Sequence, residues 1–596
     1  MTTDHDQDPY FRNETRDGMR IEWQVPIQAD DGVVLRADVY RPLADEPSPV
    51  ILSYGAYGKG MLFSEGYPVQ WASLMKLHPE IAERSSGKYM NWEVVDPERF
   101  VPAGYAVVRV DSRGAGWSPG YQNYFSSRET RDLYDAIEWA GTQPWSNGKI
   151  GLLGVSYYAE NQWCVAELAP PHLAAMIPWA GYADVYRDLN YHGGILCEFM
   201  SRWDPVHLLV QYGAGERALR NPNTGESVAG PVTLSDDELA ANRIDLWGAI
   251  KAHPFADEFH AENTADLAKV TVPLLSVANW GGQGMHTRGN FNGFTDSSSE
   301  QKWLLAHGST DPATFYNDEG VAIQKRFFDH FLKGEDNGWD KLPPVLLQVR
   351  HPGERFVRRA EREWPVARTS WTELYLDADT LSLSSEPPGK HSRRDYSATG
   401  DGLTFWLPAQ TEQIELTGPS ALKLFIDADT EDTDLFIVLQ LFDPDRREVT
   451  FQGAMDPTTP IANGWLRASH RRIDPTRSKP YQPFHPHDRR EPLDPGQVYE
   501  VDIEIWPTCV VIPVGYQLAL NVRGRDYEFT GEPPEGADTN YRFASRGTGG
   551  MTHNDPDDRP LSIFGGTVTI HTGGNTPSRV LLPFVPPADE HLTWSY

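Results

Sequence analysis

Cysteine is scarce in this sequence. The 596 residues contain only three cysteines, which are far apart and odd in number: Cys164, Cys197 and Cys509. This excludes a framework of disulfide bonds and disfavours a zinc site built on clustered cysteines. We expect three buried, free thiols and no bound metal or cofactor.

Positive charge is also in short supply. The chain carries 53 Lys and Arg against 84 Asp and Glu, a formal net charge of −31, which disfavours binding to nucleic acid or anionic lipid. No run of about 18 apolar residues is present, and the first ten residues have neither a basic region nor an apolar core. The sequence predicts a cytoplasmic protein without nucleic-acid or membrane partners, and it leaves the oligomeric state open.

The chain is too long for one ordinary core, so two or three domains are expected. After a polar stretch, residues 1–18, which we expect to be frayed, strand-like apolar runs alternate with helical patterns. A hairpin is predicted within residues 20–40, around Asp31-Gly32. Further strands are predicted at residues 49–54, 105–110, 150–155, 173–179, 272–278 and 302–305, and helices at 130–141, 157–169 and 321–333.

Residues 185–266 interrupt this alternation with helical, aromatic and charged sequence, which is typical of a helical cap inserted over a site. The sequence therefore predicts an α/β domain, residues 19–184 and 267–369, with an inserted helical cap. Residues 370–596 consist of short alternating runs separated by Gly, Pro and Asp, which predicts an all-β jelly-roll domain.

A strict nucleophile pattern, G-x-S-x-G, is missing. In G-V-S-Y-Y, Ser156 follows a predicted buried strand and precedes a helical pattern, but Tyr158 stands where the second glycine is expected. A sharp strand-to-helix turn lifts a serine hydroxyl out of the sheet, and the amide of the next residue, Tyr157, then faces a developing oxyanion. Ser156 is thus a candidate nucleophile, and the alternative is an ordinary serine at a strand end.

A general base can be named, whereas an acid cannot. His307, in K-W-L-L-A-H-G-S, follows the last core strand and is the candidate base, the alternative being a loop histidine without chemistry. The acid should follow the strand that ends at Ala278, but residues 279–289, N-W-G-G-Q-G-M-H-T-R-G, contain no carboxylate. Asp184 and Asp311 are possible substitutes that also have structural explanations, and neither is assigned.

Several motifs together resemble one family. They are S-Y-G-A-Y-G-K-G after the strand at residues 49–54, the turn-rich loop D-S-R-G-A-G-W-S-P-G at residues 111–120, and G-V-S-Y-Y-A followed by Q-W. With the inserted cap and the β domain, the chain resembles the X-Pro dipeptidyl-peptidase and cocaine esterase family of α/β hydrolases from about residue 20 to residue 590. The loop at residues 111–120 also has a purely structural explanation, in which Asp111 and Arg113 pair to brace it.

The resemblance implies roles for individual residues. It makes Ser156 the nucleophile, gives the backbone amide of Tyr157 to the oxyanion hole, and makes the Tyr57 hydroxyl, from the family's Y-x-K loop, the second oxyanion donor. His307 lies where the family's histidine loop begins but lacks the usual P-W-x-H context. Ala159 replaces a family glycine, and Gly282 stands where the family has its aspartate.

The expected function is hydrolysis of a carboxylic ester, or of an amide, in a small molecule through an acyl-enzyme on Ser156. One alternative is a catalytically impaired family member that binds a ligand or partner, because the loss of a triad acid costs about 10⁴-fold in rate. A second is an X-Pro type aminopeptidase, and a third treats the β domain as a carbohydrate-binding module. The acidic turn at residues 427–434 lacks the glycine and distal glutamate of a calcium loop, and H-P-H at residues 485–487 lacks a third metal ligand.

Overall fold

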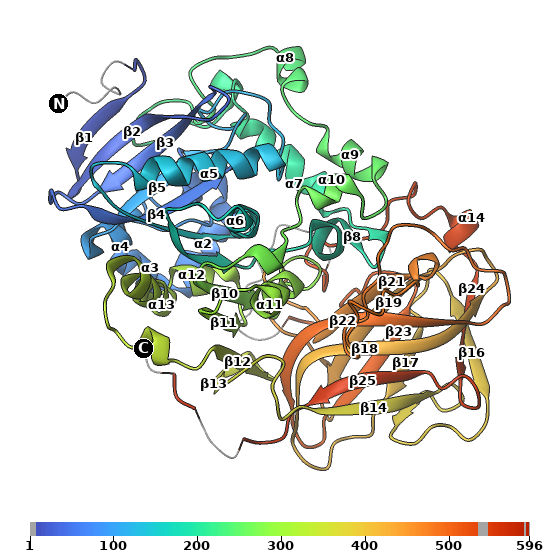
Figure 1. The fold of residues 1–596 in the computed structure, drawn as a ribbon. Coiled ribbons are helices and arrows are strands. Elements are labelled where there is room, and N and C mark those ends of the chain that lie inside the picture. The colour runs from blue at the N-terminus through green and yellow to red at the C-terminus, as the bar shows by residue number, and fades with distance from the viewer. Residues whose placement is uncertain (1–7, 534–545, 589–591, 595–596) are drawn as a thin grey trace.

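A computed structural model describes residues 8–533, 546–588 and 592–594. An α/β domain and a C-terminal β domain lie side by side, and a group of short helices covers one side of the junction between them (Figure 1). The α/β domain and the separate C-terminal β domain agree with the fold class predicted from the sequence.

The α/β domain is built on one mixed sheet. Pairing gives the strand order β1-β2-β3-β5-β4-β6-β7-β10-β11-β12-β13, in which the steps from β5 to β12 are parallel and the outer ones antiparallel. The strands are β1 (Arg12–Arg16), β2 (Met19–Gln28), β3 (Val34–Arg41), β4 (Ser48–Gly55), β5 (Ala106–Asp111), β6 (Ser146–Val155), β7 (Leu173–Trp179), β10 (Leu274–Asn279), β11 (Lys302–His307), β12 (Val345–His351) and β13 (Arg355–Glu361).

Helices cover both faces of this sheet. They are α5 (Ser127–Gly141), α6 (Tyr157–Glu167), α11 (Thr287–Asp296), α12 (Asp311–Tyr316) and α13 (Asp318–Phe328), the last continued by the π-helical turn η7 (Asp329–Lys333). In α5 the Ser126 hydroxyl accepts a hydrogen bond from the Glu129 amide and so caps the helix, whose apolar positions at helical spacing are buried. The predicted strands and helices of this domain are confirmed, with ends shifted by a few residues.

Two predictions about the first 120 residues were wrong in part. Residues 12–16, expected to be frayed, form β1 and pair with β2. The loop after β5 is braced as expected, but by other partners. Asp111 accepts hydrogen bonds from the amide and the ammonium of Lys59, whereas Arg113 pairs with Asp132.

Two helical segments lie over the carboxyl ends of the parallel strands. The predicted cap region contains the π-helical turn η3 (Tyr186–Asn190), the hairpin of β8 (Tyr191–His192) and β9 (Ile195–Leu196), and helices α7 (Phe199–His207), α8 (Asp236–Ala241), α9 (Leu246–Ala252) and α10 (Glu258–Ala261). A segment that sequence patterns did not reveal lies between β4 and β5 and contains α1 (Phe63–Gly66), α2 (Pro68–Leu77), α3 (Pro79–Arg84) and α4 (Pro97–Phe100).

The C-terminal domain has its own apolar core, formed by inward-facing residues of long antiparallel strands. Its elements are β14 (Ser370–Asp377), β15 (Ser382–Ser384), β16 (Ser392–Ser397), β17 (Leu403–Trp406), β18 (Ile414–Ala428), β19 (Asp434–Phe442), β20 (Glu448–Val449), β21 (Ala462–Arg467), β22 (Tyr499–Ile512), β23 (Gln517–Arg523), α14 (Leu561–Phe564), β24 (Thr567–Thr572) and β25 (Arg579–Phe584). The motif at residues 427–434 spans the end of β18, the turn that follows and the first residue of β19.

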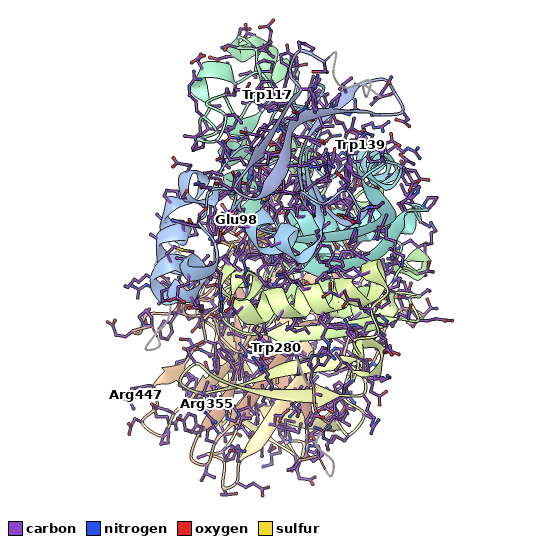
Figure 2. All side chains as sticks on the ribbon, turned by 90° about the vertical axis from the view of Figure 1, so that its left-hand side faces the viewer. Glu98, Trp117, Trp139, Trp280, Arg355 and Arg447 are labelled. Atoms are coloured by element: carbon purple, nitrogen blue, oxygen red, sulfur yellow. The ribbon has the colours of Figure 1, made fainter. Side chains whose placement is uncertain are left out.

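The two domains share an interior. Strand β12 pairs with β22 at Arg350 and Val510, and the buried Trp280 belongs to one apolar cluster with Cys509 and Val511 of β22. Figure 2 marks the fully buried Trp280 near the middle of the molecule and Arg447 near its edge. All three cysteines are free thiols, with Cys197 and Cys509 buried and Cys164 partly so. Over the described ranges of the chain, no helix combines the length and apolarity needed to cross a membrane.

Candidate active site

Ser156 occupies the sharp turn between β6 and α6. Its backbone has φ 58° and ψ −119°, a left-handed conformation that a non-glycine residue adopts only under strain. Its amide donates to the carbonyls of Trp179 (3.1 Å) and Ala180 (3.0 Å), at the end of β7. This is the geometry of a nucleophile elbow, which holds the hydroxyl above the carboxyl edge of the sheet.

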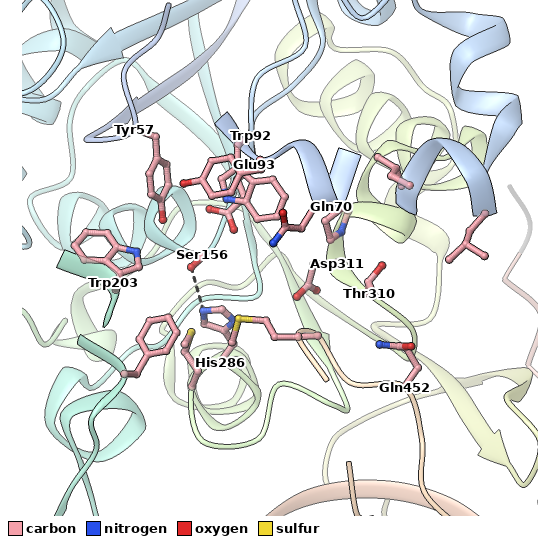
Figure 3. A pocket seen from close by; sticks show the side chains of 18 of the residues that line it. Tyr57, Gln70, Trp92, Glu93, Ser156, Trp203, His286, Thr310, Asp311 and Gln452 are labelled. Carbon is pink, nitrogen blue, oxygen red and sulfur yellow. Dashed lines mark hydrogen bonds between the residues drawn. The ribbon is translucent and has the colours of Figure 1, made fainter. Parts of the chain in front are cut away.

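His286 faces this hydroxyl. Its Nε2 atom lies 3.2 Å from Ser156 Oγ, and Figure 3 shows the two side chains pointing toward each other across the pocket floor. His286 lies at the end of the loop from β10 to α11. The carbonyl of Gly282 accepts hydrogen bonds from the amides of Met285, His286 and Thr287, so the loop coils tightly and brings the imidazole to the serine.

Burial sets the charge of this histidine. It lowers the pKa of His286 to about 3, so the ring is neutral and can accept a proton. Nδ1 has no hydrogen-bond partner among the residues that the structure describes. The nearest carboxyl is that of Glu160, with Oε1 3.6 Å from His286 Nε2, and burial raises the pKa of Glu160 well above its usual value.

His307, the base predicted from the sequence, lies elsewhere. It is fully buried at the end of β11, where Nδ1 is 2.9 Å from the Gly308 carbonyl and the ring packs against Trp179. No hydrogen bond joins it to Ser156 in the described part of the chain. The structure thus brings His286 to the serine and keeps His307 in the core, because His307 is the last residue of β11 and packs on Trp179, whereas the loop after β10 carries His286 to Ser156.

The two possible acids also differ in position. Asp184 pairs with Arg187 at 2.6 Å and serves the cap region. Asp311 borders the pocket, accepts a hydrogen bond from the Asn279 amide at 3.1 Å, and lies 3.4 Å from His307 Nε2. Burial raises the pKa of Asp311 to about 7. Neither carboxylate faces the free Nδ1 of His286.

The two predicted oxyanion donors lie beside Ser156. Tyr57 lines the same pocket, and its hydroxyl lies on the Ser156 side in Figure 3. Burial raises the pKa of Tyr57 well above its usual value, which keeps the hydroxyl protonated and able to donate. Tyr157 begins α6, so its amide has no partner inside the helix, while its side chain points away and donates to Glu129.

The pocket above Ser156 has a volume of about 130 Å³. Most of its wall is apolar or aromatic, and it draws on both helical segments, the β10 loop and the C-terminal domain. The side chains that shape it include Tyr67, Gln70, Leu74, Trp92, Phe199, Trp203, Met285, Thr310 and Met455. Two carboxyls, those of Glu93 and Asp311, also face it, and Oε2 of Glu93 has no partner among the described residues.

Two family models match this chain. The model of X-Pro dipeptidyl-peptidase (S15 family) matches residues 31–310, and that of the X-Pro dipeptidyl-peptidase C-terminal non-catalytic domain matches residues 337–581. A solved CocE/NonD family hydrolase from Staphylococcus aureus is 31% identical, with a TM-score of 0.81 over 98% of this chain and 99% of its own. The chain belongs to the X-Pro dipeptidyl-peptidase and cocaine esterase family.

This family consists of hydrolases, and the chain is a hydrolytic enzyme. Among the curated relatives, the cocaine esterase of a Rhodococcus species is 24% identical over 94% of this chain and 98% of its own length. A putative serine esterase of Mycobacterium bovis is also 24% identical, over 83% of this chain and 89% of its own length. An alpha-amino acid ester hydrolase, 16% identical with a TM-score of 0.64, shares the fold.

Proposed function

We propose that this hydrolase cleaves a carboxylic ester, or less readily an amide, of a small molecule through an acyl-enzyme on Ser156. The observation that carries the proposal is the 3.2 Å contact between the Ser156 hydroxyl and a neutral His286. The names of the relatives, a cocaine esterase and a putative serine esterase, support an ester substrate.

The first step is proton transfer from Ser156 Oγ to His286 Nε2 as the oxygen attacks the carbonyl carbon. The negative charge moves to the carbonyl oxygen, which accepts hydrogen bonds from the Tyr157 amide and the Tyr57 hydroxyl. The imidazolium then protonates the departing alcohol. Water, deprotonated by the same nitrogen, attacks the acyl-enzyme and releases the acid.

Glu160 partly replaces the missing triad aspartate by stabilising the positive charge on His286. Its carboxyl is 3.6 Å from the nitrogen that becomes charged, and no carboxyl stands closer to His286 in the described chain. Burial favours the protonated form of Glu160, so it stabilises the imidazolium in those molecules in which it is already ionised before Ser156 gives up its proton. Glu160→Gln should therefore lower kcat while leaving KM nearly unchanged.

The pocket favours an uncharged substrate with apolar parts. Burial raises the pKa of Glu93 well above its usual value and that of Asp311 to about 7, so neither wall carboxyl is fully charged at neutral pH. An X-Pro aminopeptidase remains the second candidate, because these two carboxyls would pair with the ammonium of a peptide N-terminus. Turnover of two substrates from pH 6 to pH 9 discriminates between the two functions. An esterase cleaves p-nitrophenyl butyrate faster, and an X-Pro aminopeptidase cleaves Gly-Pro p-nitroanilide faster.

The domain boundaries and the type of β domain are also part of this proposal. The chain consists of an α/β-hydrolase domain, residues 19–184 and 267–369, a cap, residues 185–266, and a C-terminal jelly roll that contributes Gln452 and Met455 to the pocket. Support for the jelly roll is that β18 pairs with β22, β24 and β25 whereas β19 pairs with β21 and β23. We place the enzyme in the cytoplasm, without nucleic-acid partners.

The decisive experiment is fluorophosphonate labelling followed by mass-spectrometric mapping, together with ester turnover. Wild type should label at Ser156, and Ser156→Ala should not label. His286→Ala should lower the labelling rate and kcat by about 10²–10⁴-fold, whereas a folded His307→Asn should stay within about tenfold of wild type.

Two results would overturn the proposal. An unlabelled but folded wild type would make the chain a silent family member that binds without turnover. The second is a loss of about 10²–10⁴-fold in kcat and labelling rate in folded His307→Asn with no loss in His286→Ala. It would make His307, the residue that the family resemblance implies, the base.

A further inference from the structure

A second cluster of reactive side chains lies where the cap meets the C-terminal domain. It consists of His192 at the end of β8, Cys197 just after β9, and His553 from the C-terminal domain, all of them 1% exposed or less. Nδ1 of His192 is 2.8 Å from Nε2 of His553. With Cys197 Sγ, the three potential ligand atoms lie within 4.8 Å of one another.

The outer nitrogens of both rings face acceptors. His553 Nδ1 is 2.7 Å from Asp526 Oδ1, and His192 Nε2 is 3.2 Å from the Asp188 carbonyl. If each outer nitrogen donates its N–H, a neutral imidazole has only a lone pair left on its inner nitrogen. The two lone pairs then face each other at 2.8 Å, an arrangement that requires a cation between them.

The cation can be a shared proton or a metal ion, and the Cys197 thiol beside the two rings supplies a soft ligand that only a metal ion would use. The Trp465 indole stacks on His192 with 4.7 Å between ring centroids, which holds that ring in place beside His553.

We propose that His192, Cys197 and His553 form a site for a divalent transition metal, with Zn²⁺ as the natural occupant. Two imidazoles and one thiolate are a ligand set that suits zinc, and a carboxylate on the outer nitrogen of a ligating histidine, here Asp526 on His553, is the usual second partner. The Cys197 thiol gives up its proton to solvent as the Zn–S bond forms. Zn–N distances of about 2.0–2.1 Å place two ligating nitrogens about 3.3 Å apart, so the rings separate by about 0.5 Å on binding.

This site differs from the one that the sequence excluded. The sequence has no clustered cysteines, and the proposed site uses a single cysteine with two histidines that lie about 360 residues apart along the chain. It ties the cap to the C-terminal domain, and so it would act as a structural clamp.

The clamp also adjoins the catalytic loop. A methyl group added at Gly284, two residues before His286, would lie 3.4 Å from His192 Cε1. Cys197 leads into α7, whose Phe199 and Trp203 line the substrate pocket. The metal therefore stabilises the wall of the pocket and takes no part in the chemistry of Ser156.

The test uses the full-length enzyme. Wild type, expressed in zinc-supplemented medium and exhaustively dialysed, should retain about one zinc per chain by elemental analysis. After removal of zinc with a chelator, Co²⁺ should produce a thiolate-to-cobalt charge-transfer band in the near ultraviolet. Cys197→Ser should abolish that band, and His553→Gln should weaken binding by about 10²-fold or more. Cys164→Ser, which alters another free thiol, should bind like wild type.

The proposal fails if folded wild type holds no more zinc than Cys197→Ser, or if the cobalt band survives in Cys197→Ser. In that case the two histidines simply share a proton in a hydrogen bond. Because wild-type metal content is the first readout, a variant that does not fold leaves the test intact. Neither outcome depends on whether Ser156 is catalytic.

Discussion

At the scale of single residues, the site is defined by which side chains reach Ser156. A hydroxyl, a neutral imidazole and a phenol converge there, while the carboxyl that such sites usually place behind the histidine is missing. A side chain at Gly282 would begin 3.1 Å from Thr287 Oγ1 and 3.3 Å from the Asn279 carbonyl. A Cβ at this position would therefore be in tight contact with the coil that delivers His286, and its neighbours would have to shift by a few tenths of an ångström to accept it.

Tyr57→Phe tests the oxyanion hole. Removal of one donor typically costs about 10²–10³-fold in kcat, and KM should change little because the ring stays in place. Tyr124→Phe is the matched control, since Tyr124 belongs to the same aromatic cluster and its buried hydroxyl has no partner among the described residues. Steady-state kinetics on one ester would show the contrast, and an unchanged kcat in Tyr57→Phe would remove this residue from the mechanism.

The pH profile tests the state of His286. Because burial lowers its pKa from 6.5 to about 3, the active, neutral form should persist well below pH 6. Asp311, with a pKa of about 7, is a pocket carboxyl that titrates in this range, so the comparison is made in Asp311→Asn. Its kcat/KM should stay level from pH 8 to pH 5. A decline centred near pH 6.5 that persists in Asp311→Asn and in the same variant carrying Glu93→Gln or Glu160→Gln, whose carboxyls also have raised pKa values, would show that His286 titrates as an exposed histidine does.

At the scale of elements, the turn from β6 to α6 is the most constrained part of the site. A methyl group on Gly154 would lie 2.3 Å from Tyr158 Cβ, and one on Gly181 would lie 2.7 Å from Ala159 Cβ. Glycines on β6 and after β7 therefore provide the space that Tyr158 and Ala159 take up. This explains how the chain tolerates both departures from the nucleophile pattern.

Gly154→Ala should consequently harm both fold and activity. The added methyl group must displace Tyr158 or the strand, at a cost of about 1–3 kcal/mol, and the displacement moves Ser156. Gly389→Ala is the control, because nothing lies within 4 Å of its added methyl group. Thermal unfolding and ester turnover should separate the two variants. Equal behaviour would mean that the turn is more plastic than its contacts indicate.

The elements that could be predicted from the sequence are those with strong local patterns. Buried parallel strands such as β7 are continuous apolar runs bounded by polar turns, and their ends were found to within a few residues. The helices between β4 and β5 were missed because they are short and begin at prolines. The position of His286 could not be predicted because no sequence pattern indicates how a glycine-rich loop coils. The only signal in the sequence was that the loop after β10 contains a histidine but no carboxylate.

At the scale of the whole molecule, the catalytic loop is held from three sides. Helix α11 follows His286, the cap lies on one side of it, and β22 of the C-terminal domain on another. Arg288 joins the three, with Nη1 2.8 Å from Asp188 of the cap and Nε 2.9 Å from Glu504 of β22. Arg187 adds hydrogen bonds from the cap to the carbonyls of His485 and Pro486. The C-terminal domain is therefore part of what positions His286.

Arg288→Met should show how much this junction contributes. The substitution leaves two carboxylates near one another without their buried cation, at an expected cost of about 3–5 kcal/mol. Orphaned carboxyls have folded-state pKa values above their unfolded ones, so they add stability at low pH and lose it as pH rises. The fall in the unfolding midpoint should accordingly be larger at pH 8 than at pH 5, and kcat should fall with it. Arg447→Met, whose guanidinium is 74% exposed beside Asp443 and Asp445, should leave the unfolding midpoint close to that of wild type at either pH, because exposed ion pairs contribute little. If Arg288→Met unfolded at the wild-type midpoint, the association of the cap with the C-terminal domain would not depend on Arg288.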